Sequence, residues 1–215
     1  MTELTSSQQP VPRGRHAPPL AVRLEVQKQR LFDAAAIVFS RVGYADASAE
    51  AISREAGMSK ATFYEHFANK EECLVALFQY ASKAVLGVLV DAARSAGPDY
   101  QDRHRAGLRA ILDIVEANPS IAQAILVETV GAGPRLAELR DRALNTVAQV
   151  MYAETVRGAE RGGGPAFASA DEAFAIVGAT FELVSRQLRT RQPERLLDLE
   201  PLVQRLILGL LSQPR

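Results

Sequence analysis

The residues best able to do chemistry in this chain form a compact series in its first third. Ser48 and Ser59 each come directly before a short segment with helical apolar spacing, where a serine hydroxyl can accept from the free amides of a helix start. Gly57 permits the left-handed backbone that ends a helix. The series therefore predicts two short helices, 48–56 and 59–67, joined by a tight turn, which is the arrangement of a helix-turn-helix motif.

The second short helix has one apolar side and one polar side. Phe63 and Phe67 are four residues apart and must face inward. The outward side then presents a cation, a hydroxyl, a phenol, a carboxylate and an imidazole, from Lys60, Thr62, Tyr64, Glu65 and His66. Such side chains can enter a DNA major groove, where base edges and phosphates offer donors and acceptors. The same Tyr64 could instead be a packed aromatic whose hydroxyl only reaches water.

Positive charge gathers close to this motif. Asn69 and Lys70 begin the next helix, and their free amides and ammonium suit a backbone phosphate. The whole chain is neutral, with 25 basic and 25 acidic residues, but residues 11–30 hold five Lys or Arg against a single Glu. The arm that carries Arg13, Arg15 and His16 could lie in a minor groove, or it could be a disordered Pro-rich tail.

The elements that position these residues are helices throughout, since apolar spacing is helical nearly everywhere and no sustained alternation indicates a strand. Turn and capping residues divide the chain into about nine helices. We expect an all-α protein with a three-helix head and a larger helical body. The expected helices are 22–42, 48–56, 59–67, 69–95, 101–117, 120–130, 134–161, 169–190 and one from about 201 onward.

The last two expected helices carry long apolar stripes. In the final helix the stripe runs from Leu199 to Leu211 at helical spacing, and in the preceding one from Phe174 to Leu188, with the small residues Gly178 and Ser185 along it. Each stripe could face the core of its own chain. Equally, the two could form the interface of a two-fold homodimer.

Several ordered motifs between residues 25 and 85 resemble the N-terminal signature of the tetracycline-repressor (TetR/AcrR) family of bacterial regulators. They are Gly43-Tyr44, Ala51-Ile52, Ala56-Gly57-Met58-Ser59, Thr62-Phe63-Tyr64, His66-Phe67 and Asn69-Lys70-Glu71-Glu72-Cys73-Leu74. The resemblance implies a flexible basic arm (1–22), a DNA-binding head (23–85, with its motif at 48–67) and a ligand-binding and dimerisation body (86–215). It further implies a transcriptional regulator that a small-molecule inducer releases from its operator. The head motif and the apolar stripes of the last two helices predict a repressor that binds a palindromic operator as a dimer, and the lack of a signal or membrane stretch predicts a cytoplasmic protein.

The resemblance also assigns roles within the motif. Lys60 and Thr62 resemble contacts to the groove or its rim, and Tyr64, His66 and Lys70 resemble phosphate clamps, with Ser48 and Ser59 at the two helix starts. Two acidic residues depart from this pattern. Glu65 would be repelled by phosphate unless it accepts from a cytosine amino group, and Glu50 stands where a basic residue would help.

The body should enclose a ligand cavity, and its apolar candidates are Phe78, Leu112, Val127, Tyr152, Phe174 and Phe181. Core packing explains the same residues equally well. Three polar residues, Gln123, Glu128 and His104, are candidates to orient a ligand.

Other classes of function find little support. Cys73 is the only cysteine, so neither an intrachain disulfide nor a thiolate zinc site can form, and we expect it to pack as a small hydrophobe rather than to sense redox state. The three histidines lack metal spacing, no phosphate-binding glycine loop occurs and no stretch suggests a signal or membrane segment. We expect no cofactor, metal or catalytic residue. The alternative function is a helical small-molecule-binding module, or an enzyme whose DNA-binding head is not used.

Overall fold

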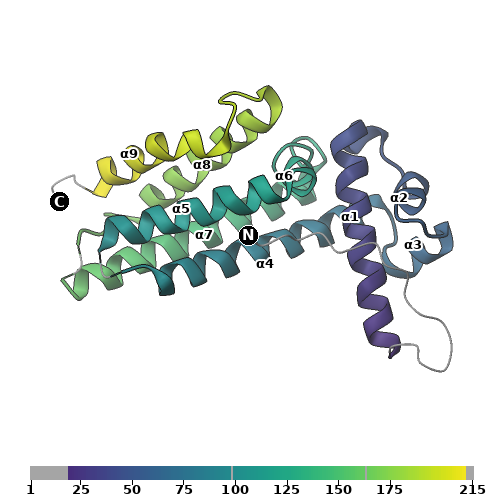
Figure 1. Cartoon of the computed structure of the whole chain (residues 1–215), viewed down its shortest axis with the longest axis horizontal. Helices are drawn as coiled ribbons and strands as arrows, with labels where there is room; N and C mark the ends of the chain where they lie inside the picture. Colours follow the sequence, from purple (N-terminus) through teal and green to yellow (C-terminus); the bar gives the residue numbers. More distant parts are fainter. Residues whose placement is uncertain (1–18, 98, 163, 212–215) are drawn as a thin grey trace.

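A computed structural model describes residues 19–97, 99–162 and 164–211, and this part of the chain is helical with no strand (Figure 1). The predicted arm lies almost wholly outside it, including Arg13, Arg15 and His16. The elements are α1 (Leu20–Asp46), α2 (Ala49–Glu55), α3 (Lys60–His66), α4 (Lys70–Ser95), α5 (Tyr100–Ala117), α6 (Pro119–Leu126), α7 (Pro134–Glu160), α8 (Ala170–Thr190), the 3-10 helix η1 (Leu196–Leu199) and α9 (Glu200–Leu211).

The predicted all-α fold is confirmed, and its helices lie close to their expected bounds. The expected stop at Gly43 takes the form of a kink, because Gly43 has a φ of 79° and the helix resumes beyond it to Asp46. The predicted caps of α2 and α3 are confirmed, since the side chains of Ser48 and Ser59 accept from amides in the first turns, and Ser169 caps α8 in the same way. The helix expected at 120–130 differs, because it begins at Pro119 after Asn118, has no side-chain cap and ends at Leu126. Sequence periodicity did not predict η1, which is too short to show a period.

The head is built on a core that continues into the body. Leu31 and Phe39 of α1, Ile52 of α2 and Phe63 of α3 are fully buried together with Leu74 of α4. Buried residues of α6 complete the same cluster. The short helices α2 and α3 therefore cannot move independently of α1 and of the first turns of α4.

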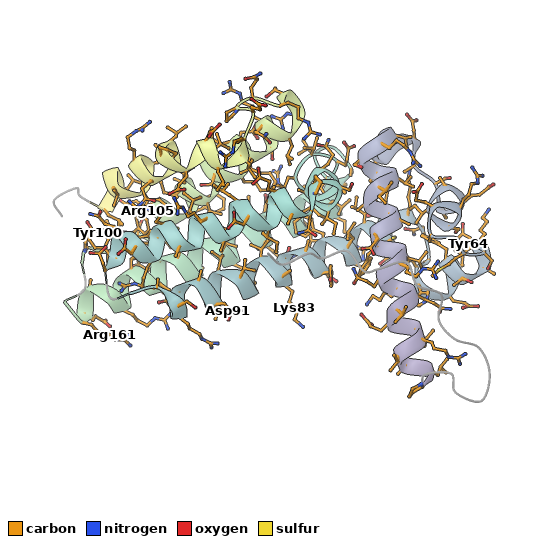
Figure 2. All side chains as sticks on the ribbon, viewed as in Figure 1. Tyr64, Lys83, Asp91, Tyr100, Arg105 and Arg161 are labelled. Atoms are coloured by element: carbon orange, nitrogen blue, oxygen red, sulfur yellow. The ribbon has the colours of Figure 1, made fainter. Side chains whose placement is uncertain are left out.

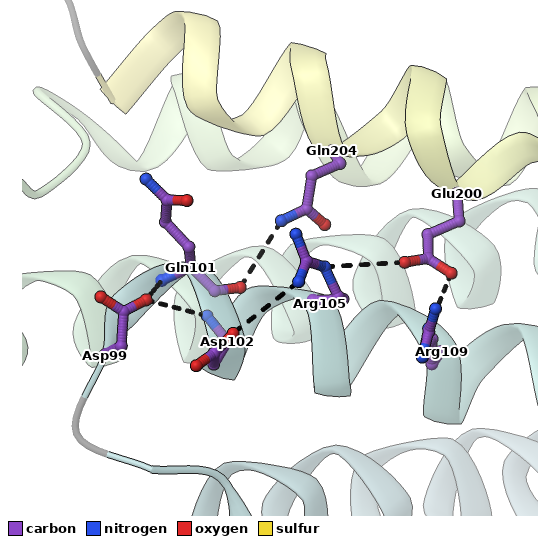
Figure 3. Close-up of polar contacts among 7 residues, drawn as sticks. All are labelled: Asp99, Gln101, Asp102, Arg105, Arg109, Glu200 and Gln204. Atoms are coloured by element: carbon purple, nitrogen blue, oxygen red, sulfur yellow. Dashed lines mark hydrogen bonds and ion pairs between the residues drawn. The ribbon is translucent and has the colours of Figure 1, made fainter.

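The body is a bundle of long helices beside this head. In Figure 1, α4, α5 and α7 run nearly parallel to one another away from α1, and α8 and α9 cover one side of them. A second core of buried residues, which includes Leu112, Phe167 and Val203, joins α5, α8 and α9. Figure 3 shows how α9 is held on α5, where Glu200 accepts from Arg109 at 2.7 Å and pairs with Arg105 at 3.8 Å.

The helix α4 is long and apolar enough, by length and composition alone, to meet the criteria for a membrane-spanning segment. Its sequence did not suggest this, because charged residues interrupt it. In the structure its first turns lie in the head core and its length packs on α5. It also carries the exposed Lys83 and Asp91, seen along its outer side in Figure 2. These contacts are those of a core helix in a helical bundle.

Candidate functional site: the surface of α3 and the cavity of the body

The orientation of α3 follows from its two phenylalanines. Phe63 is fully buried and Phe67 is 5% exposed, and their rings lie 5.6 Å apart between α1 and α4. The start of α3 is fixed by Ser59, whose hydroxyl accepts from the amide of Thr62 at 3.0 Å. With the apolar side anchored in this way, the opposite side of the helix faces solvent.

The turn before α3 is held by a residue that sequence reasoning did not single out. Arg30 of α1 donates to the carbonyl oxygen of Ala56 at 2.8 Å, and Gly57 adopts a φ of 64° directly after it. The interaction spans 26 residues of sequence, so no local pattern reveals it. It fixes the angle between α2 and α3.

The exposed side of α3 holds three of the predicted DNA-binding residues together. Lys60 is exposed, Thr62 is half-buried, and Tyr64 is 50% exposed at the end of the molecule farthest from the body (Figure 2). The Lys60 ammonium lies 6.0 Å from the centre of the Tyr64 ring. Glu65 is exposed as well, so this surface combines a cation, a hydroxyl, a phenol and a carboxylate.

His66 occupies a different position on the same helix. It is half-buried, and its Nε2 lies 3.3 Å from Oε1 of Gln27 on α1. A contact of this length orients the imidazole towards the edge between α3 and α1. His66 therefore borders the exposed side of α3 rather than standing at its centre.

Lys70 differs from its expected role as a phosphate clamp. Its ammonium donates to the carbonyl oxygens of Tyr44 at 2.8 Å, Ala45 at 2.8 Å and Ala47 at 2.9 Å. It also lies 4.7 Å from the centre of the Tyr44 ring. These three bonds use all three donors of the ammonium, so Lys70 ties the end of α1 to the start of α4. The physical reason is the kink at Gly43, which leaves carbonyl groups near the end of α1 in need of a donor.

Ser48, the predicted DNA contact at the start of α2, lies close to an acidic residue that is paired with an arginine. The hydroxyl of Ser48 is exposed and accepts from the amide of Ala51 at 3.1 Å. Nearby, Glu50 pairs with Arg54 at 3.1 Å, which compensates the carboxylate that departs from the family pattern. The start of α2 therefore does not present an uncompensated negative charge.

A carboxylate links the body to the kink of α1. Glu128, which follows α6, accepts from the backbone N–H of Tyr44 at 3.1 Å and from Nε2 of Gln123 at 3.3 Å. Both polar residues were candidates to orient a ligand, and neither lines the cavity of the body. Their contacts connect α6 to the head instead.

The body encloses a cavity of about 470 Å³ between α4, α5, α7, α8 and α9. This volume lies within the range of ligand pockets, and most of the wall is apolar. Of the six candidates taken from the sequence, only Phe181 lines it. Phe78 is buried in the head core, Leu112 is fully buried in the body core, Val127 and Tyr152 pack against that core, and Phe174 is 37% exposed.

Sequence reasoning chose large apolar residues, whereas the wall is made mainly of smaller aliphatic residues on facing helix sides. One side of α5 illustrates the missed signal, because Tyr100, Arg103, His104, Gly107 and Leu108 recur at helical spacing and all line the cavity. Periodicity reveals such a side but not whether it meets a neighbour or a void. Among the described residues, no three His, Cys, Asp or Glu side chains come together as metal ligands would.

The apolar stripe of α9 divides into two sides. Val203, Ile207 and Leu211 are buried in the chain's own core, whereas Leu202 and Leu206 are 36% and 38% exposed. On α8, Phe174 is also exposed. Part of each predicted stripe therefore serves the core, and part of each remains on the surface.

Residues 31–77 match the model of the bacterial regulatory proteins of the tetR family. None of the curated proteins matches the chain in sequence. Solved structures do resemble it. The fatty acid degradation regulator FadR from Bacillus halodurans has a TM-score of 0.73 at 22% identity, over 87% of this chain and 97% of that one.

Two further structures of this fold contain ligands. FadR from Bacillus subtilis in complex with stearoyl-CoA has a TM-score of 0.74 at 19% identity, covering 86% of this chain and 98% of that one. FadR from Thermus thermophilus, a TetR family repressor in complex with lauroyl-CoA, has a TM-score of 0.62 at 18% identity, over 87% and 97% of the two chains. At these identities the likeness establishes the fold.

The structure combines a helix-turn-helix head that exposes one side of α3 with a helical body that contains a cavity. The family model matches residues 31–77, so the sequence likeness to the tetR family covers the head and the start of α4, and the solved structures extend the likeness of fold to the body.

Proposed function

We propose that this regulator is a cytoplasmic homodimeric repressor that inserts α3 of each subunit into successive major grooves of a palindromic operator. The observation that carries this proposal is the exposed side of α3, where Lys60, Thr62 and Tyr64 stand opposite two buried phenylalanines. Successive major grooves on one side of a duplex are about 34 Å apart, which requires two copies related by a two-fold axis.

In this proposal Lys60 and Thr62 contact the groove or its rim, and Tyr64 and His66 contact phosphates. Ser48 and Ser59 lie at the starts of α2 and α3, where exposed hydroxyls border the same surface. Lys70 acts indirectly, by holding the end of α1 against α4. We assign no catalytic role to any residue.

The dimer would form through α8 and α9. Their exposed residues Phe174, Leu202 and Leu206 leave apolar surface in water, and a two-fold partner would bury it. Replacing Leu202 and Leu206 together by Glu should convert the dimer to a monomer in sedimentation velocity. Val130→Glu is the control, because Val130 is 57% exposed and lies between α6 and α7, outside α8 and α9.

Release from DNA would follow from a small molecule in the body cavity. An apolar compound that binds the cavity more tightly in one arrangement of the two heads shifts the dimer towards that arrangement. The size of the shift in equilibrium cannot exceed the difference in the compound's affinity for the two arrangements. The acyl-CoA complexes of the two FadR structures support an apolar ligand of this kind.

The test of DNA binding is a mobility-shift titration of the full chain on duplex DNA flanking its own gene, at several salt concentrations. Lys60→Ala should weaken binding and reduce the slope of log affinity against log salt by about 0.9, because one cationic contact at the groove rim that releases counterions is lost. Lys83→Ala is the control, since Lys83 is an exposed lysine on the body (Figure 2). Equal effects of the two substitutions would reject α3 as the DNA-binding surface.

A further inference from the structure

The cavity of the body is polar at one end only. The charged residues of its wall, and all but one of its hydrogen-bonding residues, come from the end of α4, the start of α5 and the end of α7: Arg94, Tyr100, Arg103, His104, Glu154 and Thr155. The exception is Thr180 of α8, whose hydroxyl donates to the carbonyl oxygen of Ile176. Tyr100 lies at the end of the molecule opposite Tyr64 of the head (Figure 2). Towards α6 the wall is almost wholly aliphatic, including Val115 and Leu126. The polarity of the cavity therefore changes along its length.

His104 is a half-buried polar group at this end of the cavity. Its ring lies between those of Tyr100, at 6.5 Å, and Phe167, at 6.3 Å. Within the described part of the chain the contacts of its ring are these aromatic ones, and the half-buried side chain lines the cavity. A neutral imidazole offers one N–H donor and one lone pair for a hydrogen bond. A ligand atom in the cavity would satisfy them.

The charge at the polar end favours an anion. Among the described residues of the wall the one carboxylate is that of Glu154, and it already pairs with Arg157 at 2.8 Å. Two guanidinium groups, those of Arg94 and Arg103, belong to the same end of the wall. Thr155 adds no donor, because its hydroxyl donates to the carbonyl oxygen of Tyr152 at 2.8 Å. The local balance is therefore positive.

We propose that the cavity binds an amphiphile with one apolar chain and an anionic or ester-type head, whose oxygen accepts from His104 beside Arg94 and Arg103. The chain of the ligand runs towards Leu126. This inference rests on the proposal that the cavity is the effector site, and it adds the class and the direction of the ligand. A free carboxylate and an acyl thioester share the required carbonyl oxygen.

Calorimetric titration of the full chain with saturated carboxylates from octanoate to palmitate tests the apolar part. Affinity should rise about fourfold with each buried methylene until the cavity is filled. The preference for the polar group of the ligand is tested at one chain length with dodecanoate, dodecanoyl-CoA, dodecanol and dodecyltrimethylammonium. We expect the two acyl compounds to bind at least tenfold more tightly than the ammonium compound, and the tighter of the two acyl compounds identifies the source of the head. Equal binding of anion and cation, or no binding of any compound, overturns the proposal.

Variants then locate the part of the wall that binds the polar group of the ligand. His104→Leu should lower the affinity for dodecanoate by about three- to tenfold, the value of one hydrogen bond, with little change for dodecanol, and His104→Gln should recover most of the loss. The control is Thr180→Val in the same wall, because the Thr180 hydroxyl already donates to the carbonyl oxygen of Ile176. Equal losses of affinity in His104→Leu and Thr180→Val would mean that the polar group of the ligand binds elsewhere. Operator binding without ligand, measured in parallel, separates this failure from failure of the regulator proposal.

Discussion

Replacing Lys70 by Met should destabilise the protein, because the ammonium binds three carbonyl groups at the junction of α1 and α4. A hydrogen bond to a charged group contributes about 1.5 to 3 kcal/mol. The three bonds share one nitrogen, and water can reach the exposed Ala45, so their contributions do not add in full. We expect a loss of about 3 kcal/mol in the free energy of unfolding, which lowers Tm by about 6 to 12 °C for a chain of this size.

The assay is thermal unfolding by circular dichroism, paired with the salt dependence of operator binding. Lys70→Met should lower Tm and leave the salt slope of the remaining folded protein close to that of the native chain, since no phosphate contact is removed. Lys60→Ala provides the opposite pattern, with an unchanged Tm and a smaller slope. If Lys70→Met left Tm unchanged and reduced the slope by about 0.9, Lys70 would be a phosphate contact and its assignment to the junction would be refuted.

Three further changes test other parts of the structure. Burial raises the pKa of the Cys73 thiol to about 12, so a thiol reagent at neutral pH should react with it only at the rate of unfolding, and rapid reaction of the native protein would contradict this. Burial, with Arg103 adding to it, lowers the pKa of His104 to about 4 from the 6.5 of the unfolded chain. As pH drops, the imidazole is therefore protonated first in the unfolded state, and the free energy of unfolding falls by roughly 2 to 3 kcal/mol between about pH 6.5 and 4. Urea titrations of the native protein should show this loss, and those of His104→Gln should not. Glu128→Ala should speed hydrogen exchange at the amide of Tyr44 at least tenfold, whereas Glu128→Gln keeps an acceptor oxygen and should change it less.

The elements of this fold were predictable because local signals were strong and agreed with one another. Ser48, Ser59 and Ser169 precede helices, and each does cap one in the structure. Phe63 and Phe67, four residues apart, gave the buried side of α3 and thereby its exposed side. Such patterns can be recognised from sequence because the two interacting groups, whether hydroxyl and amide or two rings, lie within one helical turn of each other.

The contacts that join distant segments were not predictable in the same way. The acceptors of Lys70 exist only because Gly43 kinks α1, and the partner of Glu128 lies 84 residues away. The cavity wall was misjudged for a related reason. Large apolar residues such as Phe78 and Leu112 fill space and so mark cores, whereas a void is what remains where smaller side chains meet.

The helix α4 connects the two places where ligand and DNA would act. Its last part, from Val85 to Arg94, lines the cavity, and its first residue is Lys70, which holds the end of α1. At 1.5 Å per residue its 26 residues span about 39 Å as one continuous helix. A ligand that displaces the cavity end of α4 must therefore either move the Lys70 end or bend the helix. Because Lys70 is bonded to three carbonyl groups of the segment that leads into α2, movement of that end would be transmitted to the head rather than absorbed by a loop.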